Sequence, residues 1–588
     1  MKFDPYRSAV RHFKAGRYAE AQSFCQQSLQ KDPENADALH LMGALHLLSG
    51  RHDQAVGWIV GAIRKSPQPN YLVSLGHTLL KLGRGDEAIQ CFDKAVQLKP
   101  DDAGLWMKLG EALLQLQRND FALMAFQHVT ELDPSQSDAF FKSAILLHYS
   151  GKYEEALARF DRCPESAALH RERARTLQEL KRFAEALAAN QKAEAIEPSN
   201  GDICNNIGSC LRFLGREEEA LQWYERADAA LPNTVEILNN RAMLLGDLQR
   251  FDEAFALYDD MKIRGLGNSL TDWNRSHIEL LTGNFDAGWR SREARWSKPN
   301  PIAYPAFDRP MWLGEGSIDG KTILLHVDEG LGDTIQFVRY APMLADRGSR
   351  VILVVEPAAR RLLANLPGVS QCLSYPASPL PGFDLQCAIG SLPLAFQTRL
   401  ETIPAATAYL PRPAEDRISA WESRLAKGEG LRVGLVWSGN STHLNDRIRS
   451  IPLSRMAGLL DIDASFVSLQ KDPRPADKAF LATRTDIQDF TADLADLSDT
   501  AALIECLDLI ITVDTSVAHL AGALGRPTWI LLPYTPDYRW LLGREDSPWY
   551  PTARLFRQTE TRDYGQVIDQ VRKELAELVL RQRRAAGA

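Results

Sequence analysis

The sequence is short of several features that mark other classes of protein. No apolar run approaches the roughly 20 residues that a membrane-spanning helix needs, and no apolar core follows Met1 as in a signal peptide. The eight cysteines are scattered and form no Cys-x-x-Cys pair, which favours ordinary thiols over disulfides or a metal site. We therefore expect a cytoplasmic protein that is not inserted into a membrane and holds no metal.

An excess of positive charge is also missing. The net charge is −8 and neither half of the chain is basic, which argues against nucleic acid or an anionic membrane as the main partner. Apolar residues make up 45% and charged residues 24% of the chain, as in ordinary globular proteins. Because 588 residues are too many for one core, we expect several domains.

The first half contains a regular repeat. A small residue followed twelve positions later by alanine recurs, mostly every 33 or 34 residues, and prolines close most of the units. Small residues let two helices pack closely, an aromatic residue four positions after most of these alanines fills the space beside them, and proline ends the second helix. The aligned pairs are Gly43/Ala55, Gly76/Ala88, Gly110/Ala122, Ala144/Ala156, Ala174/Ala186, Gly208/Ala220 and Ala242/Ala254.

This pattern resembles the tetratricopeptide repeat (TPR), a helical hairpin, over about residues 5–262, with a degenerate unit at 283–289. TPR arrays form a superhelix whose groove binds a peptide or a helix, which implies a protein partner. Asparagines at the starts of first helices can hold a ligand's backbone amides, and the candidates are Asn205, Asn206, Asn239 and Asn240. Helix capping or solvated surface would explain the same residues, and the array could instead be a spacer.

The pattern changes after a proline-rich stretch that includes Pro299, Pro301, Pro305 and Pro310. Short β-branched runs then alternate with helix-length segments, which predicts parallel α/β sheets with a ligand cleft at the carboxyl ends of the strands. The expected fold is an α-solenoid followed by two Rossmann-like lobes. We expect a TPR superhelix at 1–266, a degenerate unit and linker at 267–310, lobes at 311–415 and 416–580, and a tail at 581–588. The expected strands are 322–327, 350–356, 383–389, 432–438, 466–470, 507–514, 528–533 and 554–557.

The first of three polar motifs follows the strand at 322–327. Gly330 and Gly332 form a turn into a helix, where backbone N–H groups can approach a ligand, and Glu329 and Asp333 lie beside them. A glycine turn of this kind is weak evidence by itself.

The other two motifs follow strands of the second lobe. Ser438 and Asn440 form a tight turn, and Arg447 and Arg449 follow it with guanidinium groups that suit phosphate, although surface arginines are an equal alternative. In the third motif, the segment 514–519 ends a buried strand and opens a helix whose N-terminus favours a diphosphate. Asp514 could be only an N-cap and His519 only a packed helix residue.

Together the motifs resemble GT-B glycosyltransferases, and the segment 514–519 is similar to the donor-binding signature of the heptosyltransferase family. The joining of TPR repeats to such a module is similar to the architecture of protein O-GlcNAc transferases. The segments 330–337, 432–440, 513–525 and 546–552 resemble those of bacterial TPR-fused glycosyltransferases. Some of those enzymes are flagellin glycosyltransferases that attach a nonulosonic acid.

The resemblance implies a metal-independent transfer of sugar from a nucleotide sugar, which is a co-substrate and not a cofactor. Asp333 is then the expected base for the acceptor hydroxyl, with Glu329 as the alternative, and Lys471 is a candidate for contact with the donor phosphate. The donor stays open among CMP-, UDP- and ADP-sugars. The residues expected at the donor are Gly330, Gly332, Ser438, Asn440, Arg447, Arg449, Asp514, Thr515, Ser516 and His519.

The leading hypothesis is therefore a protein O-glycosyltransferase that recruits a polypeptide through its TPR groove. The favoured acceptor is flagellin, and the favoured sugar is a nonulosonic acid such as pseudaminic acid. A transferase of envelope polysaccharide assembly is one alternative. The other is a TPR adaptor whose transferase lobes are inactive.

Overall fold

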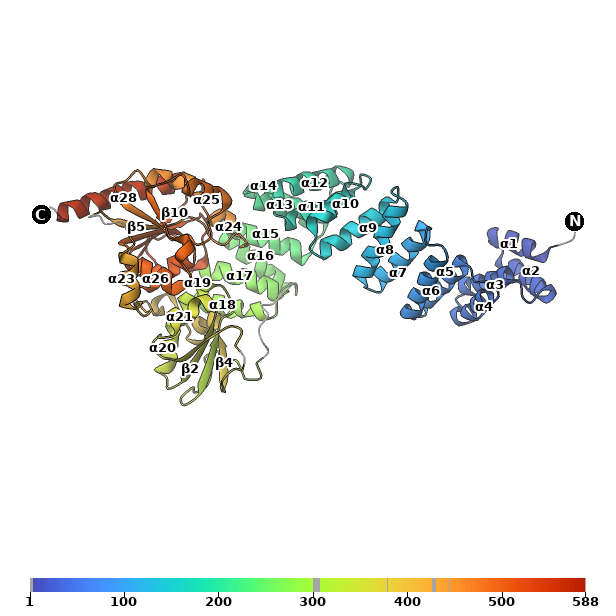
Figure 1. Ribbon diagram of the computed structural model, residues 1–588, viewed down its shortest axis with the longest axis horizontal. Helices are drawn as coiled ribbons and strands as arrows, with labels where there is room; N and C mark the ends of the chain where they lie inside the picture. The colour runs from blue at the N-terminus through green and yellow to red at the C-terminus, as the bar shows by residue number, and fades with distance from the viewer. Residues whose placement is uncertain (1–3, 300–306, 378, 426–429, 444, 587–588) are drawn as a thin grey trace. The chain divides into compact units, whose positions relative to one another are not determined.

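The computed structural model describes residues 4–299, 307–377, 379–425, 430–443 and 445–586. It divides into two compact units, Met1–Ile237 and Leu238–Ala588, which are described separately below (Figure 1). Pro301 and Pro305 of the expected linker and the last two residues of the expected tail lie outside the described residues. Within the described residues, no helix has both the length and the apolar character needed to cross a bilayer.

Successive helical hairpins form the first unit, and its prediction as a TPR solenoid is confirmed. The aligned small residues face the aromatic residues of the second helices: a Cβ on Gly76 would lie 2.8 Å from the Phe92 ring, and one on Gly208 would lie 2.8 Å from Tyr224. Its helices are α1 (Pro5–Lys14), α2 (Tyr18–Lys31), α3 (Ala36–Leu48), α4 (His52–Lys65), α5 (Pro69–Lys81), α6 (Gly85–Leu98), α7 (Ala103–Gln115), α8 (Asn119–Leu132), α9 (Ser137–Tyr149), α10 (Tyr153–Phe160), α11 (Ala167–Glu179), α12 (Phe183–Ile196), α13 (Gly201–Phe213) and α14 (Glu217–Ala230).

The turn inside each hairpin needs one residue with positive φ. Glycine occupies this position in most hairpins, for example Gly83 at +73° and Gly215 at +75°, because it lacks the Cβ that makes this conformation costly. Gln117 and Lys181 adopt φ of +58° at the same position. In each hairpin the second helix begins two residues after this positive-φ residue, so the chain reverses direction at the same point of every repeat.

The last repeat helices belong to the second unit, whose boundary falls inside α15 (Val235–Asp247). The C-terminal end of α15 is bound to the six-stranded lobe, because the Asp247 carbonyl accepts hydrogen bonds from Thr535 Oγ1 and Arg562 Nη2, both at 2.8 Å. Gln249 Nε2 donates to the Tyr534 carbonyl at 2.8 Å. The following helices are α16 (Phe251–Ile263), α17 (Ser269–Leu281) and α18 (Phe285–Arg292), and α18 continues into the 3-10 turn η1 (Glu293–Trp296).

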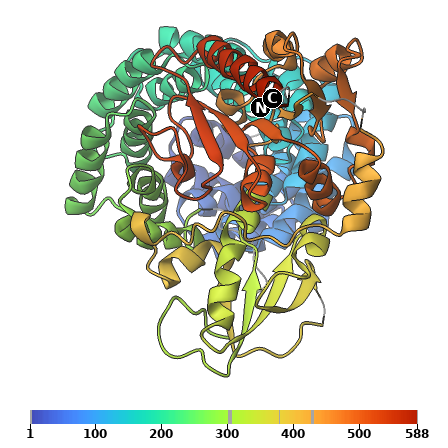
Figure 2. The same cartoon turned by 90° about the vertical axis from the view of Figure 1, so that its left-hand side faces the viewer.

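Two parallel sheets complete the second unit, as predicted (Figure 2). Within the described residues, the first sheet has the order β3-β2-β1-β4 and the second the order β10-β9-β8-β5-β6-β7. Figure 2 shows the four-stranded sheet in yellow-green below the orange-red six-stranded sheet. The strands are β1 (Thr322–His326), β2 (Arg350–Val355), β3 (Val369–Ser374), β4 (Leu385–Ala388), β5 (Arg432–Val436), β6 (Ser465–Ser468), β7 (Ile487–Asp489), β8 (Leu509–Val513), β9 (Thr528–Leu532) and β10 (Ala553–Arg557).

Helices cover both sheets, and apolar side chains such as Leu325, Ile510 and Leu532 pack between the layers. The longest helix, α28 (Tyr564–Ala586), packs Val571 and Leu575 into the core of the six-stranded lobe. The remaining helices are α19 (Leu331–Phe337), α20 (Ala341–Ala345), α21 (Pro357–Leu363), α22 (Leu392–Ala395), α23 (Glu415–Glu422), α24 (Asp446–Arg449), α25 (Pro475–Leu481), α26 (Leu497–Glu505) and α27 (Ser516–Ala523).

Candidate active site

Each sheet has one point where the direction of strand addition reverses. In the six-stranded sheet the chain builds outward from β5 through β6 to β7 and then returns to place β8 on the other side of β5. In the four-stranded sheet the same reversal separates β1 from β4. Ligands of open parallel sheets bind beyond the carboxyl ends of the strands at such points. All three sequence motifs follow β1, β5 or β8, so each begins at one of these two positions.

Asp328 joins the two loops at the reversal point of the first lobe. Its Oδ1 accepts a hydrogen bond from the Gly390 N–H at 2.9 Å, and its Oδ2 accepts one from Arg295 Nε at 2.9 Å. Arg295 is fully buried and also donates to Ser391 Oγ at 2.6 Å. Burial raises the pKa of Asp328 to about 6 even though Arg295 opposes the shift. Both carboxylate oxygens are thus used to hold the loops after β1 and β4 together.

Glu329, one of the two predicted bases, forms an ion pair with Arg292 at the end of α18. A second arginine, Arg539, has its Nη2 atom 4.0 Å from Glu329 Oε2. Burial alone would raise the pKa of Glu329, but Arg292 and Arg295 outweigh it and the net shift is downward. Glu329 is therefore a carboxylate at neutral pH, and its Oε1 has no hydrogen-bond partner among the described residues.

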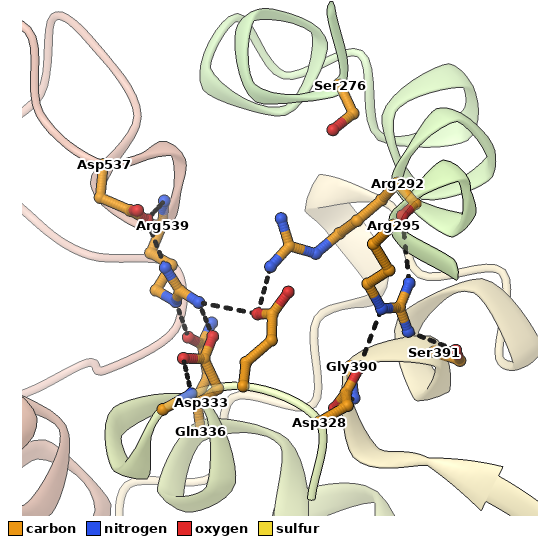
Figure 3. A network of polar contacts seen from close by, with 12 residues as sticks. Ser276, Arg292, Arg295, Asp328, Asp333, Gln336, Gly390, Ser391, Asp537 and Arg539 are labelled. Atoms are coloured by element: carbon orange, nitrogen blue, oxygen red, sulfur yellow. Dashed lines mark hydrogen bonds and ion pairs between the residues drawn. The ribbon is translucent and has the colours of Figure 1, made fainter. Parts of the chain in front are cut away.

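Asp333, the other predicted base, lies in the first turn of α19 and is the point where the two lobes meet. Its Oδ2 accepts a hydrogen bond from the Gly330 N–H at 3.1 Å, and its Oδ1 pairs with Arg539 from the second lobe. Arg539 also donates to Gln336 Oε1 at 2.6 Å and to Asp537 Oδ1 at 2.6 Å. Figure 3 shows Arg539 between Asp537 and Asp333, with Gln336 beside Asp333.

His519 lies in α27, and Gly332 in α19 packs against its imidazole ring. A Cβ on Gly332 would lie 2.8 Å from His519 Cδ2, so the two helices can approach this closely only with glycine there. His519 Nδ1 lies 2.8 Å from Tyr550 Oη, and the imidazole stacks on Trp540 with ring centroids 5.4 Å apart. Burial lowers its pKa to about 3, so the ring is neutral and serves the packing of the two lobes.

The loop after β5 is held by side chains from neighbouring loops. Gln470 Oε1 accepts hydrogen bonds from the Ser438 N–H at 3.0 Å and the Trp437 N–H at 3.2 Å. Arg449 lies against Gly439, where a Cβ would be 2.8 Å from its Nη2. Arg449 Nε and Ser438 Oγ are buried without partners in the part of the chain that the structure describes. Both residues belong to the segment that follows β5, the strand at the reversal point of this sheet.

Asp514 directly follows the neighbouring strand β8 and is 9% exposed. Burial raises the pKa of Asp514, whereas the positive charge of Arg449 opposes this shift. The loops after β5 and β8 therefore interact electrostatically. Thr515 is the N-cap residue of α27, and its Oγ1 lies 3.2 Å from Thr512 Oγ1. Ser516 begins the helix.

The remaining donor candidates belong to the segments that follow β5 and β6. Asn440 Oδ1 accepts a hydrogen bond from the Thr442 N–H at 3.0 Å within its own turn. Arg447 is exposed, and so is Lys471, which donates to the Ala495 carbonyl at 3.4 Å.

Among the asparagines predicted to bind a polypeptide, Asn205 Nδ2 donates to Glu236 Oε1 at 3.1 Å, and Asn239 Oδ1 accepts from Asn274 Nδ2 at 3.0 Å. Both of these are buried, whereas Asn206 and Asn240 are half-buried.

Sequence reasoning missed three arginines of this region: Arg292, Arg295 and Arg539. Two of them follow Trp289 at the end of the degenerate repeat, in a basic run of residues 290–298 that could have drawn attention. Among the described residues, no group of three or more His, Cys, Asp or Glu side chains is placed to hold a metal ion.

The chain joins a helical repeat array to two parallel α/β lobes, with polar loops at both reversal points. Comparison with protein families adds that the glycosyltransferase family 9 (heptosyltransferase) model matches residues 487–570. TPR models match residues 12–74, 76–117, 103–136, 144–201 and 201–233. The chain thus carries TPR repeats in its N-terminal half and a glycosyltransferase family 9 domain at its C-terminus.

The chain is similar to Protein FlbA of Caulobacter vibrioides, with 30% identity over 331 residues, which cover 50% of this chain and 53% of that protein. The chain thus spans about half the length of this curated relative. Solved structures that match part of the chain include the TPR protein YrrB, with 23% identity over 32% of this chain and 90% of that one and a TM-score of 0.25. A TPR protein of Cytophaga hutchinsonii has 16% identity over 40% of this chain and 98% of that one, with a TM-score of 0.36.

Proposed function

We propose that the protein is an O-glycosyltransferase that recruits a polypeptide through its repeats and transfers a sugar from a nucleotide sugar to a serine or threonine. The observation that supports this most directly is the pairing of Asp333 with Arg539. It brings a carboxylate at the reversal point of one lobe against an arginine of the lobe that carries the family 9 match.

In this proposal Asp333 is the base that takes the proton of the acceptor hydroxyl, while the hydroxyl oxygen attacks the anomeric carbon and the nucleotide phosphate leaves. General-base assistance of this kind contributes about 10²–10⁴-fold to a rate. Arg539 releases Asp333 when the acceptor hydroxyl approaches and remains beside the charge that develops. Arg449 and the backbone N–H groups at Ser516 face the leaving phosphate, so the transfer needs no metal ion.

The acceptor and the sugar follow from the resemblance to flagellin glycosyltransferases. We propose flagellin as the acceptor and a nonulosonic acid such as pseudaminic acid as the sugar, with a CMP-, UDP- or ADP-linked donor and a cytoplasmic reaction. The groove asparagines Asn206 and Asn240 are half-buried and are the members of the asparagine set that a bound polypeptide could reach more readily.

The Asp333→Asn variant tests the proposed base. Transfer should fall by about 10²–10⁴-fold, because the amide cannot accept the hydroxyl proton, while acceptor binding should be unchanged. Glu329→Gln tested in parallel distinguishes the two carboxylates. Asp286→Asn is the matched control, because it removes a carboxylate from an exposed ion pair with Arg399 elsewhere in the same unit. An Asp333→Asn enzyme that transfers sugar at the wild-type rate would refute the assignment.

Intact-mass spectrometry of flagellin from cells with and without this protein tests the acceptor and the sugar together. A mass difference that disappears with the protein identifies both. Unchanged flagellin beside a changed second protein would contradict only the choice of acceptor. If no protein changes mass while a surface polysaccharide does, the enzyme modifies glycans and the proposal is wrong.

A further inference from the structure

Polar atoms without partners gather around Arg292, outside the pair proposed for proton transfer. Arg292 is 2% exposed, and its Nη2 pairs with Glu329, but its Nε and Nη1 have no acceptor in the described part of the chain. Tyr538 Oη and Glu329 Oε1 are also unpartnered there. A buried polar group without a hydrogen bond destabilises a fold, so a cluster of such groups indicates that another molecule completes it.

The three side chains lie together. The Arg292 guanidinium centre is 4.9 Å from the ring centroids of both Tyr538 and Trp273, and the same guanidinium pairs with Glu329. Figure 3 shows Arg292 extending from α18 into the space between Arg539 and Arg295. The Glu329 side chain is 12% exposed and the following Gly330 is exposed, so the cluster lies just beneath the surface of the loop after β1.

The charges around this cluster disfavour an anionic ligand. Arg292, Arg295 and Arg539 each form ion pairs, and their carboxylate partners outnumber them: Glu293, Asp328, Glu329, Asp333 and Asp537. A phosphate or carboxylate placed here would therefore meet a net negative environment. A neutral ligand with hydrogen-bonding groups avoids this repulsion.

The unpartnered atoms also indicate the number of groups that the ligand must offer. Arg292 Nε and Nη1 carry three protons and the Tyr538 hydroxyl one, whereas Glu329 Oε1 can only accept. One hydroxyl accepts about two hydrogen bonds and donates one, so the single hydroxyl of a serine or threonine cannot satisfy four donors. Two or more neighbouring hydroxyls can satisfy them, and a sugar ring carries such hydroxyls.

We infer that Arg292, Glu329 and Tyr538 form a subsite for the hydroxyl groups of the transferred sugar. This inference rests on the proposed function, because it assigns part of the donor to a cluster beside Asp333. It also gives Glu329 a binding role and leaves Asp333 as the base. The subsite takes Arg292 from the last repeat hairpin, so that hairpin is a part of the transferase site.

Calorimetric titration of the full chain tests the subsite with three pairs of probes: CMP and CMP-N-acetylneuraminic acid, UDP and UDP-N-acetylglucosamine, and ADP and ADP-glucose. The quantity measured is the ratio of the Kd of the free nucleotide to that of its sugar conjugate. In Tyr538→Phe this ratio should fall about three- to tenfold for the conjugate that the wild type prefers, with the free-nucleotide Kd unchanged, since one hydrogen bond to the sugar is lost. Arg292→Lys keeps the charge opposite Glu329 but removes several donors, so the ratio should fall further.

Tyr340→Phe is the matched control, because the Tyr340 hydroxyl bonds Thr398 Oγ1 at 2.7 Å inside the four-stranded lobe. Its ratio should stay at the wild-type value while its melting temperature falls. The inference is overturned if Tyr538→Phe and Arg292→Lys keep the wild-type ratio, as they would if ordered water fills the cluster. It is overturned equally if they weaken the free nucleotide as much as the conjugate, or if they change only the KM of the acceptor.

A wild-type chain that binds no nucleotide would contradict the proposed function and still leave the subsite testable. Thermal shift with free N-acetylneuraminic acid and N-acetylglucosamine then decides it. Stabilisation of the wild type that Tyr538→Phe loses supports the subsite. Absence of any stabilisation overturns it.

Discussion

Gln117 and Gln249 occupy the positive-φ position of their hairpins, where most repeats have glycine. A side chain in this conformation costs about 1–2 kcal/mol, and the structure explains the presence of only one of these two glutamines. Gln249 Nε2 donates to the Tyr534 carbonyl in the six-stranded lobe, whereas Gln117 is exposed on a turn of the first unit. Gln249 thus makes a contact that glycine could not make, whereas nothing in the structure explains why Gln117 is not glycine.

This difference predicts opposite outcomes for one substitution. Gln117→Gly should raise the free energy of unfolding of the first unit by about 0.5–1 kcal/mol, because relief of the backbone strain exceeds the added entropy of the unfolded chain. Gln249→Gly gains the same relief but loses the bond to Tyr534, so it should be neutral or destabilising. Urea denaturation of the full chain measures both. Equal stabilisation by the two variants would show that the contact at Gln249 contributes nothing.

Three histidines make the second unit sensitive to acid. Burial lowers the pKa of His277 and His519 to about 3 and that of His326 to about 4, below the value of about 6.5 of an unfolded chain. Unfolded molecules therefore bind protons first as the pH falls. The contribution of these histidines to the stability is complete above pH 6.5 and should decline by about 1.4 kcal/mol per pH unit for each histidine between about pH 6 and pH 4.

His519→Gln tests this pH dependence. The variant is less stable at pH 7.5, but the slope of its unfolding free energy between pH 6 and pH 4.5 should be smaller by about one proton, because one protonating group has been removed. Calorimetric scans at several pH values measure the slope of the transition that belongs to the second unit. His128→Gln removes an exposed imidazole from α8 and is the control. A His519→Gln slope identical to that of the wild type would contradict the explanation.

Among the elements, the short helix α18 contacts both lobes. Trp289 Nε1 donates to the Thr398 carbonyl at 3.0 Å, and the ring lies edge-on to Phe337 of the first lobe and to Tyr538 and Trp549 of the second, with centroids 5.8–6.5 Å apart. One turn later the same helix supplies Arg292 to Glu329. The position of the two lobes around Asp333 therefore depends on α18.

Trp289→Ala should accordingly destabilise the second unit by about 3–5 kcal/mol, the usual cost of removing a large buried ring. Hydrogen exchange should increase in α19 and in the segment 538–549 together, because both pack on the lost side chain. Trp223→Ala is the control, since that tryptophan is partly exposed in the first unit with Arg226 over its ring. Exchange that increases in only one lobe would mean that α18 does not link the two.

The elements also show where sequence reasoning succeeds and where it fails. Strands β1, β5 and β8 are almost wholly buried and apolar, so their runs were recognisable, as were the motifs that follow them. Strand β3 is half-exposed and polar, β7 has three residues, and both lie at sheet edges, so neither leaves a clear pattern. The partners of Asp333 and Glu329 come from distant segments, Arg539 being 206 residues away, and no local pattern encodes such a pair.

For the whole molecule, the compact units do not coincide with the change from repeats to α/β lobes. The second unit begins within α15, and its Asp247 carbonyl is held by Thr535 and Arg562. Two repeat hairpins are therefore structural parts of the transferase unit.

This division predicts how the chain can be shortened. A chain that begins at Pro232 keeps α15 through α18 and should fold with one cooperative melting transition, because every contact between these helices and the lobes is retained. A chain that begins at Gly267 lacks α15 and α16 and should be less stable or insoluble, since Tyr534, Thr535 and Arg562 lose their partners. Solubility and calorimetry of the two chains test this. Equal melting temperatures would show that the repeats are dispensable for the fold.

The stacking of the first unit has a mechanical consequence. Its helices pack mainly against the next helix along the chain, so a pulling force can open one interface at a time while the neighbours stay intact. In the second unit, β1 lies between β2 and β4, and Asp333 is tied to a residue far along the chain, so many contacts must break together. Under a pulling force, the repeats of the first unit should therefore open first, one interface at a time, while the second unit keeps its fold.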